Sequence, residues 1–228
     1  ADDGRAVVIL DRNGRFKCRM VGKTSGNVLL RQAQHDTVRD ATKSTTIAAA
    51  MTAGKVKNAR NVLMRSAREA VCPDEEKRLR KSADVQADAL FRLKTSRDTD
   101  HVRGLEGEAA AAYFDVFTLM MKPAERESLP MNGRNRRPPL DPVNALISFL
   151  YTLLLNDCIS ALEGVGLDPQ LGFLHVPRPG RPSLGLDLME EFRAFMADRL
   201  AITLVNRKQI TADHFEPRPG GAVYLNEK

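Results

Sequence analysis

The sequence predicts a mainly α-helical protein, with an α-helical domain over residues 25–228 preceded by the remnant of a small β domain over residues 1–24. Two observations carry this prediction. Short apolar segments joined by a turn signal occur only at the start of the chain, and from Asn27 onward the apolar residues recur with helical spacing. At 228 residues the chain is long enough to bury a substantial core.

Residues 5–10 and 15–21 are predicted to be two strands of a hairpin. They are joined by Asp11–Gly14, and the Asn13-Gly14 pair in that segment is a strong hairpin signal. A two-stranded sheet alone is only marginally stable in water. We therefore expect these strands to belong to a larger β domain whose other strands lie outside this sequence.

The rest of the chain is expected to be almost entirely helical. The clearest start is Asp141-Pro142, with Asp as the N-cap and Pro at the first helical position. The longest apolar run, Leu146–Leu155, is too short to span a bilayer and is assigned to the core. Residues 122–140 are expected to be a loop. The predicted helices are 27–36, 44–70, 74–95, 99–121, 141–164, 183–199 and a short one near 211–215.

The composition indicates which kinds of binding partner are favoured. The 35 Lys and Arg residues against 29 Asp and Glu give a net charge of +6, which favours an anionic partner such as nucleic acid. Aromatic residues make up only 5% and Trp is absent, which disfavours a single-strand binder built on base stacking.

The three cysteines lie far apart in the sequence. Cys18, Cys72 and Cys158 form no CxxC pair, which argues against a structural zinc site and a disulfide framework. Few cysteines without a disulfide pattern are typical of proteins in a reducing cytosol, so we expect a cytoplasmic protein that does not act in a membrane.

His175 and the acids that follow it are the strongest candidate for a chemical site. His175 is the only His in a loop rich in Pro and Gly, and the next helix carries Asp187 and Glu190 three apart, on one face. One imidazole beside carboxylates suits a divalent ion such as Mn²⁺ or Mg²⁺. On spacing alone, a solvated helix face and a surface His are the commoner interpretation.

The loop around Gly133–Pro139 is the second candidate site. It carries Arg134, Arg136 and Arg137 in a segment stiffened by prolines. Guanidinium groups match phosphate oxygens, so the loop is either a phosphate clamp or a basic surface loop, and charge alone leaves both interpretations open.

Four segments, in order, resemble the CRISPR-associated integrase family, the nucleases that acquire new spacers. They are residues 103–114 (Arg-Gly-Leu-Glu-Gly at their start), residues 133–151, the loop around His175, and residues 183–193; a looser match follows at 220–226. Each segment is weak alone, but their joint order and spacing are specific.

The resemblance implies an N-terminal β domain followed by an α-helical catalytic domain in a prokaryotic cytoplasmic protein. Family members form homodimers and assemble with a small ferredoxin-like partner protein. They act on double-stranded and branched DNA, namely the spacer precursor and the CRISPR repeat, as metal-dependent endonucleases and integrases. The reaction inserts spacer DNA into the CRISPR array by attack of a 3′ hydroxyl on a phosphodiester.

The resemblance also implies the residues of the site. Glu106, His175 and Glu190 would bind Mg²⁺ or Mn²⁺, with Asp187 as a further catalytic acid one turn earlier. Glu106 lies between Gly104 and Gly107, which would let a helix or a DNA backbone come close. Asn144 and Tyr151 share a helix face behind the ligands, where Asn144 would hydrogen-bond a metal ligand or a phosphate. The alternative interpretation is a satisfied core Asn and a packed Tyr. The residues expected to contact DNA are Arg134, Arg136, Arg137, Arg178 and Arg181.

Two alternatives remain at this point. A non-catalytic DNA-binding scaffold of the same fold would lack the metal. A nuclease or transposase of the RNase-H kind would place its acids on strands. Because the acids named here lie on predicted helices, this second alternative is ranked lower.

Overall fold

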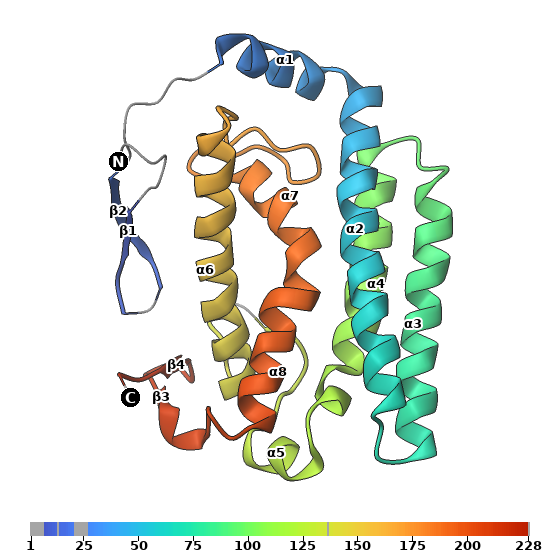
Figure 1. Cartoon of the computed structure of the whole chain (residues 1–228), viewed down its shortest axis with the longest axis vertical. Coiled ribbons are helices and arrows are strands. Elements are labelled where there is room, and N and C mark those ends of the chain that lie inside the picture. Colours follow the sequence, from blue (N-terminus) through green and yellow to red (C-terminus); the bar gives the residue numbers. More distant parts are fainter. Residues whose placement is uncertain (1–6, 13, 21–26, 136, 228) are drawn as a thin grey trace.

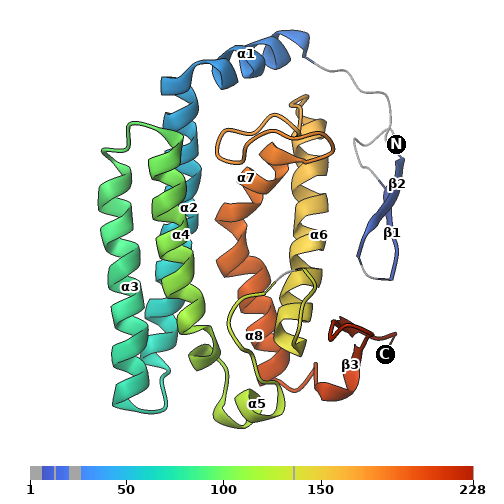
Figure 2. The same ribbon diagram turned by 180° about the vertical axis from the view of Figure 1, so that it is seen from behind.

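The protein consists of two groups of helices packed side by side, seen in a computed structural model that describes residues 7–12, 14–20, 27–135 and 137–227 (Figures 1 and 2). This confirms the predicted mainly α fold. One group comprises α2 (Ala41–Arg68), α3 (Pro73–Leu93) and α4 (Thr99–Asp115), and the other comprises α6 (Pro142–Gly164), α7 (Ser183–Phe192) and α8 (Arg199–Asn206).

The predicted hairpin is present at the start of the described chain. Strands β1 (Val7–Leu10) and β2 (Phe16–Met20) pair antiparallel, with Val7 opposite Met20. Gly14 takes a positive φ of 74° in the turn and donates its backbone N–H to Asp11 O. The outer ends of the predicted strands and the predicted domain boundary at residue 24 lie outside the described residues.

Side-chain caps fix the starts of several helices. Asn27 caps α1 (Val28–Arg39), Asp40 caps α2 and Asp98 caps α4, each through a side-chain oxygen that accepts backbone N–H groups of the first turn. Helix α1 lies across one end of the molecule, and α2 then runs the length of the first helical group (Figure 1).

Helix α2 is the element on which both groups pack. It contacts α3 and α4 on one side and α7 on the other. Val56 and Leu63 are fully buried, and Leu63 shares the main core cluster with Phe117 and Ile147, which come from other elements. Burial of these side chains is the main source of cohesion between the two groups.

Helix α6 begins as predicted, with Asp141 capping Asn144 N–H and Pro142 at the first position. By length and composition α6 alone among the described helices could cross a membrane, with a mean hydropathy of 1.7. Its residues Leu146 and Ile147 lie instead in the main core, as predicted for the apolar run.

Helices α6 and α7 approach closely at Gly185. A Cβ atom at this position would lie 3.0 Å from Ile159 Cγ1 and 3.3 Å from Leu155 Cδ1 of α6. On the other side of α7, a Cβ on Gly54 of α2 would lie 2.9 Å from Glu191 Cδ. Both glycines let α7 sit deep between α2 and α6, which places its acidic residues inside the molecule.

The helix predicted over 183–199 was wrong in its length and its regularity. Helix α7 ends at Phe192, a π-helical segment (η2) covers Arg193–Asp198, and α8 continues to Asn206. Apolar spacing does not distinguish a π-helical turn from an α-helical one within a continuous helix, so the sequence pattern could not show it.

Short elements were also missed. Helix α5 (Pro123–Ser128) lies within the predicted loop 122–140, and the predicted helix 99–121 stops at Asp115 before a 3₁₀ turn, η1 (Phe117–Met120). A second small sheet pairs β3 (Phe215–Pro217) with β4 (Val223–Leu225), after a 3₁₀ turn (η3, Ala212–His214) where a short helix was predicted. Three-residue strands are too short to show alternation.

Replacement of Leu63 by Ala tests this packing. Because the side chain is fully buried, we expect Leu63→Ala to lower the free energy of unfolding by about 2–5 kcal/mol. The exposed Leu140 offers a matched control, and Leu140→Ala should change the free energy of unfolding by less than about 0.5 kcal/mol. Denaturant unfolding measures both, and equal effects would contradict the assigned core.

Candidate active site

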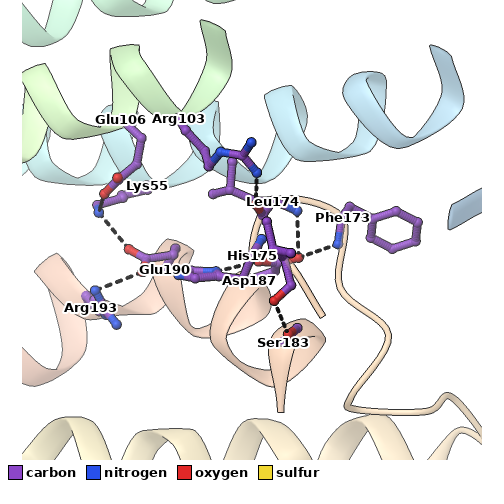
Figure 3. Close-up of polar contacts among 11 residues, drawn as sticks. Lys55, Arg103, Glu106, Phe173, Leu174, His175, Ser183, Asp187, Glu190 and Arg193 are labelled. Carbon is purple, nitrogen blue, oxygen red and sulfur yellow. Dashed lines mark hydrogen bonds and ion pairs between the residues drawn. The ribbon is translucent and has the colours of Figure 1, made fainter. Parts of the chain in front are cut away.

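The residues predicted to form the site come together where α2, α4, α7 and the loop around His175 meet. Glu106 projects from α4, Glu190 from α7 and His175 from the loop, and Figure 3 shows all three side chains around one region. Lys55 of α2 lies among them. The sequence analysis did not identify Lys55, because a single Lys on a helix rich in basic residues carries no distinguishing pattern.

Lys55 forms ion pairs with both carboxylates. Its Nζ lies 2.6 Å from Glu190 Oε2 and also pairs with Glu106 Oε1 (Figure 3). The lysine side chain is only 13% exposed. Burial favours the neutral amine, but the charges of Glu190 and Glu106 outweigh burial and raise the pKa of Lys55. The ammonium is therefore charged and joins α2 to α4 and α7.

Glu190 is an ionised carboxylate inside the protein. Its side chain is 3% exposed, and Oε1 lies 2.8 Å from Arg193 Nη1. Burial alone would raise the pKa of Glu190, but the charges of Lys55 and Arg193 outweigh it and bring the pKa to about 2. Oε2 is buried and makes no hydrogen bond of normal geometry, although it faces the Lys55 ammonium.

Asp187 holds the His175 loop against α7. It is fully buried, and its Oδ2 accepts the backbone N–H groups of Phe173 and Leu174 at 2.6 and 2.9 Å. Oδ1 accepts the backbone N–H of His175 at 2.9 Å and lies 2.6 Å from the Nδ1 of its ring. With both oxygens engaged, Asp187 positions His175; its expected role as a further catalytic acid stays a prediction.

The bond to Asp187 also determines which His175 nitrogen is available. A carboxylate beside Nδ1 favours the tautomer that carries its proton there, which leaves Nε2 as the lone-pair nitrogen. The ring is partly exposed and lies beside the Glu190 carboxylate. His175 thus offers one oriented nitrogen toward the acids.

Gly172 makes this arrangement possible. A Cβ atom on Gly172 would lie 2.7 Å from the backbone carbon of Ser183 and 2.8 Å from Asp187 Oδ2. Arg103 of α4 adds a bond from Nη1 to Leu174 O, 3.1 Å long, and so ties the loop to the helix that carries Glu106. The sequence analysis assigned no role to Gly172 or Arg103.

The donor set suits a hard divalent cation. Two carboxylates and one imidazole are ligands that Mg²⁺ or Mn²⁺ accept, and a cation already lies between the two carboxylates in the form of the Lys55 ammonium. Among the residues that the structure describes, no three His, Cys, Asp or Glu side chains converge closely enough to hold a metal as they stand. Lys55 occupies the space between them.

The arginine loop turns partly inward. Arg134 Nη1 donates to Asn144 Oδ1 at 2.6 Å, and its guanidinium lies 5.7 Å from the Phe114 ring centroid and 5.5 Å from that of Tyr151. Arg137 is exposed, and Arg136 lies outside the described residues. Of the three arginines in the predicted phosphate clamp, Arg134 is thus held within the wall of the site.

Asn144 anchors this loop rather than contacting a carboxylate of the site. It is fully buried; its Nδ2 donates to Gly133 O and Asp141 Oδ2, and its Oδ1 accepts the backbone N–H of Asn135. The expected hydrogen bond from Asn144 to a metal ligand is absent from its described contacts. Its position is that of a satisfied core Asn.

Tyr151 lies closer to the carboxylates. Its ring lies 4.6 Å from the Arg193 guanidinium, which in turn pairs with Glu190, and its hydroxyl donates to Asp198 Oδ1 at 2.7 Å. Both Arg193 and Asp198 come from the π-helical segment that the sequence pattern did not reveal.

A groove of about 520 Å³ lies beside Glu106. Lys55, Arg134 and Arg193 contribute positive charge to its lining, together with Phe114 and Tyr151. Among the described residues, apart from the chain neighbours and the nearby backbone of α4 itself, no atom lies within 4 Å of a Cβ built on Gly104 or Gly107. Of the two expected neighbours of these glycines, a helix or a DNA backbone, no described helix packs here, and this face of α4 is open.

The loop that carries His175 also presents cations to solvent. Arg178 is exposed and Arg181 is partly exposed, and within the described part of the chain neither guanidinium forms an ion pair. Their position beside the site is compatible with the expected contact with DNA phosphates.

Replacement of Asp187 by Asn tests the role of this acid. The amide NH₂ of Asn would face backbone N–H donors, so we expect Asp187→Asn to cost about 1–3 kcal/mol of stability. Backbone amides of residues 172–176 should exchange hydrogen faster by mass spectrometry. The exposed Asp157 on α6 provides the control Asp157→Asn. Unchanged exchange in this loop would contradict the assigned role.

The chain is similar over its whole length to known proteins. The chain is 54% identical over 227 residues to the CRISPR-associated endonuclease Cas1 1 of Moorella thermoacetica and 49% identical over 235 residues to Cas1 2 of Rhodospirillum rubrum. It covers all of its own length in both alignments and 66% of each relative. The chain thus spans about two thirds of the length of these relatives.

Solved structures show the same fold. A CAS1 protein from Thermotoga maritima matches 97% of this chain and 67% of its own, with a TM-score of 0.80 and 25% identity. A casposase bound to integration product matches 97% of this chain and 59% of its own, with a TM-score of 0.81 and 26% identity. The family described as CRISPR associated protein Cas1 matches residues 1–228, and the chain belongs to that family.

Proposed function

We propose that this chain carries the catalytic site of a divalent-metal-dependent DNA endonuclease and integrase, which inserts spacer DNA into a CRISPR array. One observation supports this most directly: Glu106 and the buried Glu190, which come from different helices, share one cation, with an oriented imidazole beside them. A protein spends stability on such a cluster of like charges where a cation is needed for chemistry.

Glu106, His175 and Glu190 would hold Mg²⁺ or Mn²⁺. Glu190 is ionised at neutral pH, its Oε2 lacks a hydrogen bond of normal geometry, and His175 keeps Nε2 free of the bond to Asp187. A bound divalent ion supplies Lewis acidity at a phosphodiester oxygen. Since Lys55 lies between the carboxylates, its ammonium must withdraw when the ion enters.

The residues of the chain would then position the DNA. The withdrawn Lys55 ammonium can pair with a phosphate in the adjoining groove, where Arg134 and Arg193 add positive charge. The open face at Gly104 and Gly107 admits the sugar-phosphate backbone next to Glu106. Exposed Arg178, Arg181 and Arg137 extend the positive surface on which double-stranded or branched DNA would lie.

The reaction exchanges one phosphorus–oxygen bond for another. An attacking oxygen, from a 3′ hydroxyl in strand transfer or from water in cleavage, forms a new bond to phosphorus and loses its proton. The opposite phosphorus–oxygen bond breaks, and its oxygen leaves with the electron pair and then takes up a proton. The protein needs only to hold the reactants in line and to stabilise the charge.

The comparisons support this choice of reaction. The relatives are named endonucleases, and one structural neighbour is a casposase bound to its integration product. Another neighbour, 26% identical, is a partial Cas6-RT-Cas1–Cas2 complex, which supports assembly with a small partner protein. A homodimer, a ferredoxin-like partner and a cytoplasmic location are part of the proposal.

A non-catalytic DNA-binding scaffold of the same fold is the second candidate. It requires no convergence of acids and imidazole, whereas here Lys55 bridges Glu106 and Glu190, and Asp187 fixes His175 beside them. An RNase-H-like site is disfavoured by the same geometry, because Glu106 and Glu190 lie on helices.

Substitution of the proposed ligands separates catalysis from binding. We expect Glu106→Ala and His175→Ala each to lower DNA cleavage and strand transfer by at least about 100-fold, since even residues behind metal ligands cost 10–100-fold. DNA affinity should change by less than about threefold, because it depends on distributed phosphate contacts. Glu108→Ala is the matched control on α4, since Glu108 is exposed and pairs with Arg92. If the protein were a non-catalytic scaffold, the three variants would not differ in DNA cleavage or strand transfer.

Replacement of Lys55 is expected to strengthen metal binding, whereas replacement of the proposed ligands is expected to lower activity. Because its ammonium competes for the carboxylates, Lys55→Met should tighten Mn²⁺ binding by roughly tenfold or more, as expected from removal of a unit charge within about 4 Å. Calorimetric titration with Mn²⁺ measures this, and Lys57→Met on the exposed side of α2 is the control. Weaker Mn²⁺ binding in Lys55→Met would show that the ion does not enter between these carboxylates.

A further inference from the structure

A buried polar network lies directly behind Glu190. Asp198 is 1% exposed, and its Oδ1 accepts the Tyr151 hydroxyl at 2.7 Å. The Tyr151 ring lies under the Arg193 guanidinium, and Arg193 Nη1 contacts Glu190 Oε1 at 2.8 Å. A chain of contacts therefore leads from Asp198 to one oxygen of the proposed metal ligand.

The π-helical turn gives Arg193 and Asp198 a common direction. They are the first and last residues of this segment. In an α-helix, residues five apart point to different sides, but the wider π-helical turn brings them nearer to one face. Both side chains reach Tyr151 of α6 as a result. Such turns within α-helices occur frequently at functional sites.

The stability of the fold does not explain why Asp198 is buried. Burial raises the pKa of Asp198 to about 6, despite the hydrogen bond from Tyr151 and the charge of Arg193. Replacing buried ionic groups by apolar ones is often neutral or stabilising, so a buried carboxylate is weak evidence of a structural role. The buried hydroxyl of Tyr113 also lies close to Asp198.

The network reaches the region of Lys55 as well. A small cavity of about 30 Å³ is lined by Lys55, Tyr113, Tyr151, Arg193 and Asp198. Arg193 engages Glu190 Oε1, whereas Lys55 faces Oε2. The two oxygens of Glu190 thus have different partners, and the orientation of the carboxylate depends on where Arg193 is held.

We propose that Asp198 is a positioning residue that acts through Tyr151 and Arg193 to hold Glu190 with Oε2 turned toward Glu106 and His175. Arg193 clamps Oε1, Tyr151 supports the flat guanidinium, and Asp198 fixes Tyr151 and balances the charge of Arg193. This inference rests on the proposed function, because it takes Glu190 as a ligand of the divalent ion.

Binding of Mn²⁺ alone, without DNA, tests the inference by calorimetry. Asp198→Asn retains an oxygen for the Tyr151 hydroxyl but removes the charge, and Tyr151→Phe removes the hydroxyl and retains the ring. Each should weaken Mn²⁺ binding by about 10–100-fold, the range found when residues behind metal ligands are changed. Tyr151→Phe is informative even where Asp198→Asn fails to fold.

A matched control separates positioning from stability. Glu125 is another buried carboxylate, on α5 at the far end of the molecule from the His175 loop (Figure 1). Glu125→Gln removes a buried charge in the same way and should leave Mn²⁺ affinity unchanged. If Asp198→Asn and Tyr151→Phe lower the melting temperature but bind Mn²⁺ like the unaltered protein, the positioning role is wrong.

Glu190→Gln distinguishes this failure from that of the proposed function. Loss of Mn²⁺ binding in Glu190→Gln, together with normal binding in both network variants, refutes only the role of Asp198. Normal Mn²⁺ binding in Glu190→Gln refutes the metal site itself, and with it the inference.

Discussion

The ion pairs of Lys55 with Glu106 and Glu190 are the interaction on which the rest of the site depends. A buried carboxylate such as Glu190 needs a cation beside it to stay ionised, because burial favours protonation. Lys55 supplies this cation from α2, the helix on which both helical groups pack. The same contacts therefore join the helices and keep Glu190 charged.

Around these ion pairs, other polar groups hold the side chains and loops of the candidate site in place. Asp187 fixes His175, Arg193 fixes Glu190, and Asn144 fixes the loop of Arg134. Buried polar groups need partners, so their partners largely determine their positions. This explains why Asp187 and Asn144 are fully buried although they belong to polar residue types.

The positive charges fall into two sets with different physical roles. Arg134 and Arg193 stack on Tyr151 and line the groove, whereas Arg178 and Arg137 are exposed. Guanidinium groups held in place lose little entropy when they meet a phosphate, and exposed ones provide attraction over a longer range. The two sets would serve positioning at the site and capture of DNA respectively.

The sequence alone predicted the helical class and most helix starts, because caps and helical periodicity are local properties. The order of the motifs added Glu106, His175 and Glu190 as metal ligands, and this ligand set stays a prediction. The sequence did not reveal Lys55, Arg193 or Asp198, nor that Asp187 binds a loop backbone while Asn144 anchors another loop. Those roles depend on which helix faces which, and on a π-helical turn that leaves the apolar pattern unchanged. These roles follow from the folded arrangement, since a buried charge is positioned by partners distant in the sequence.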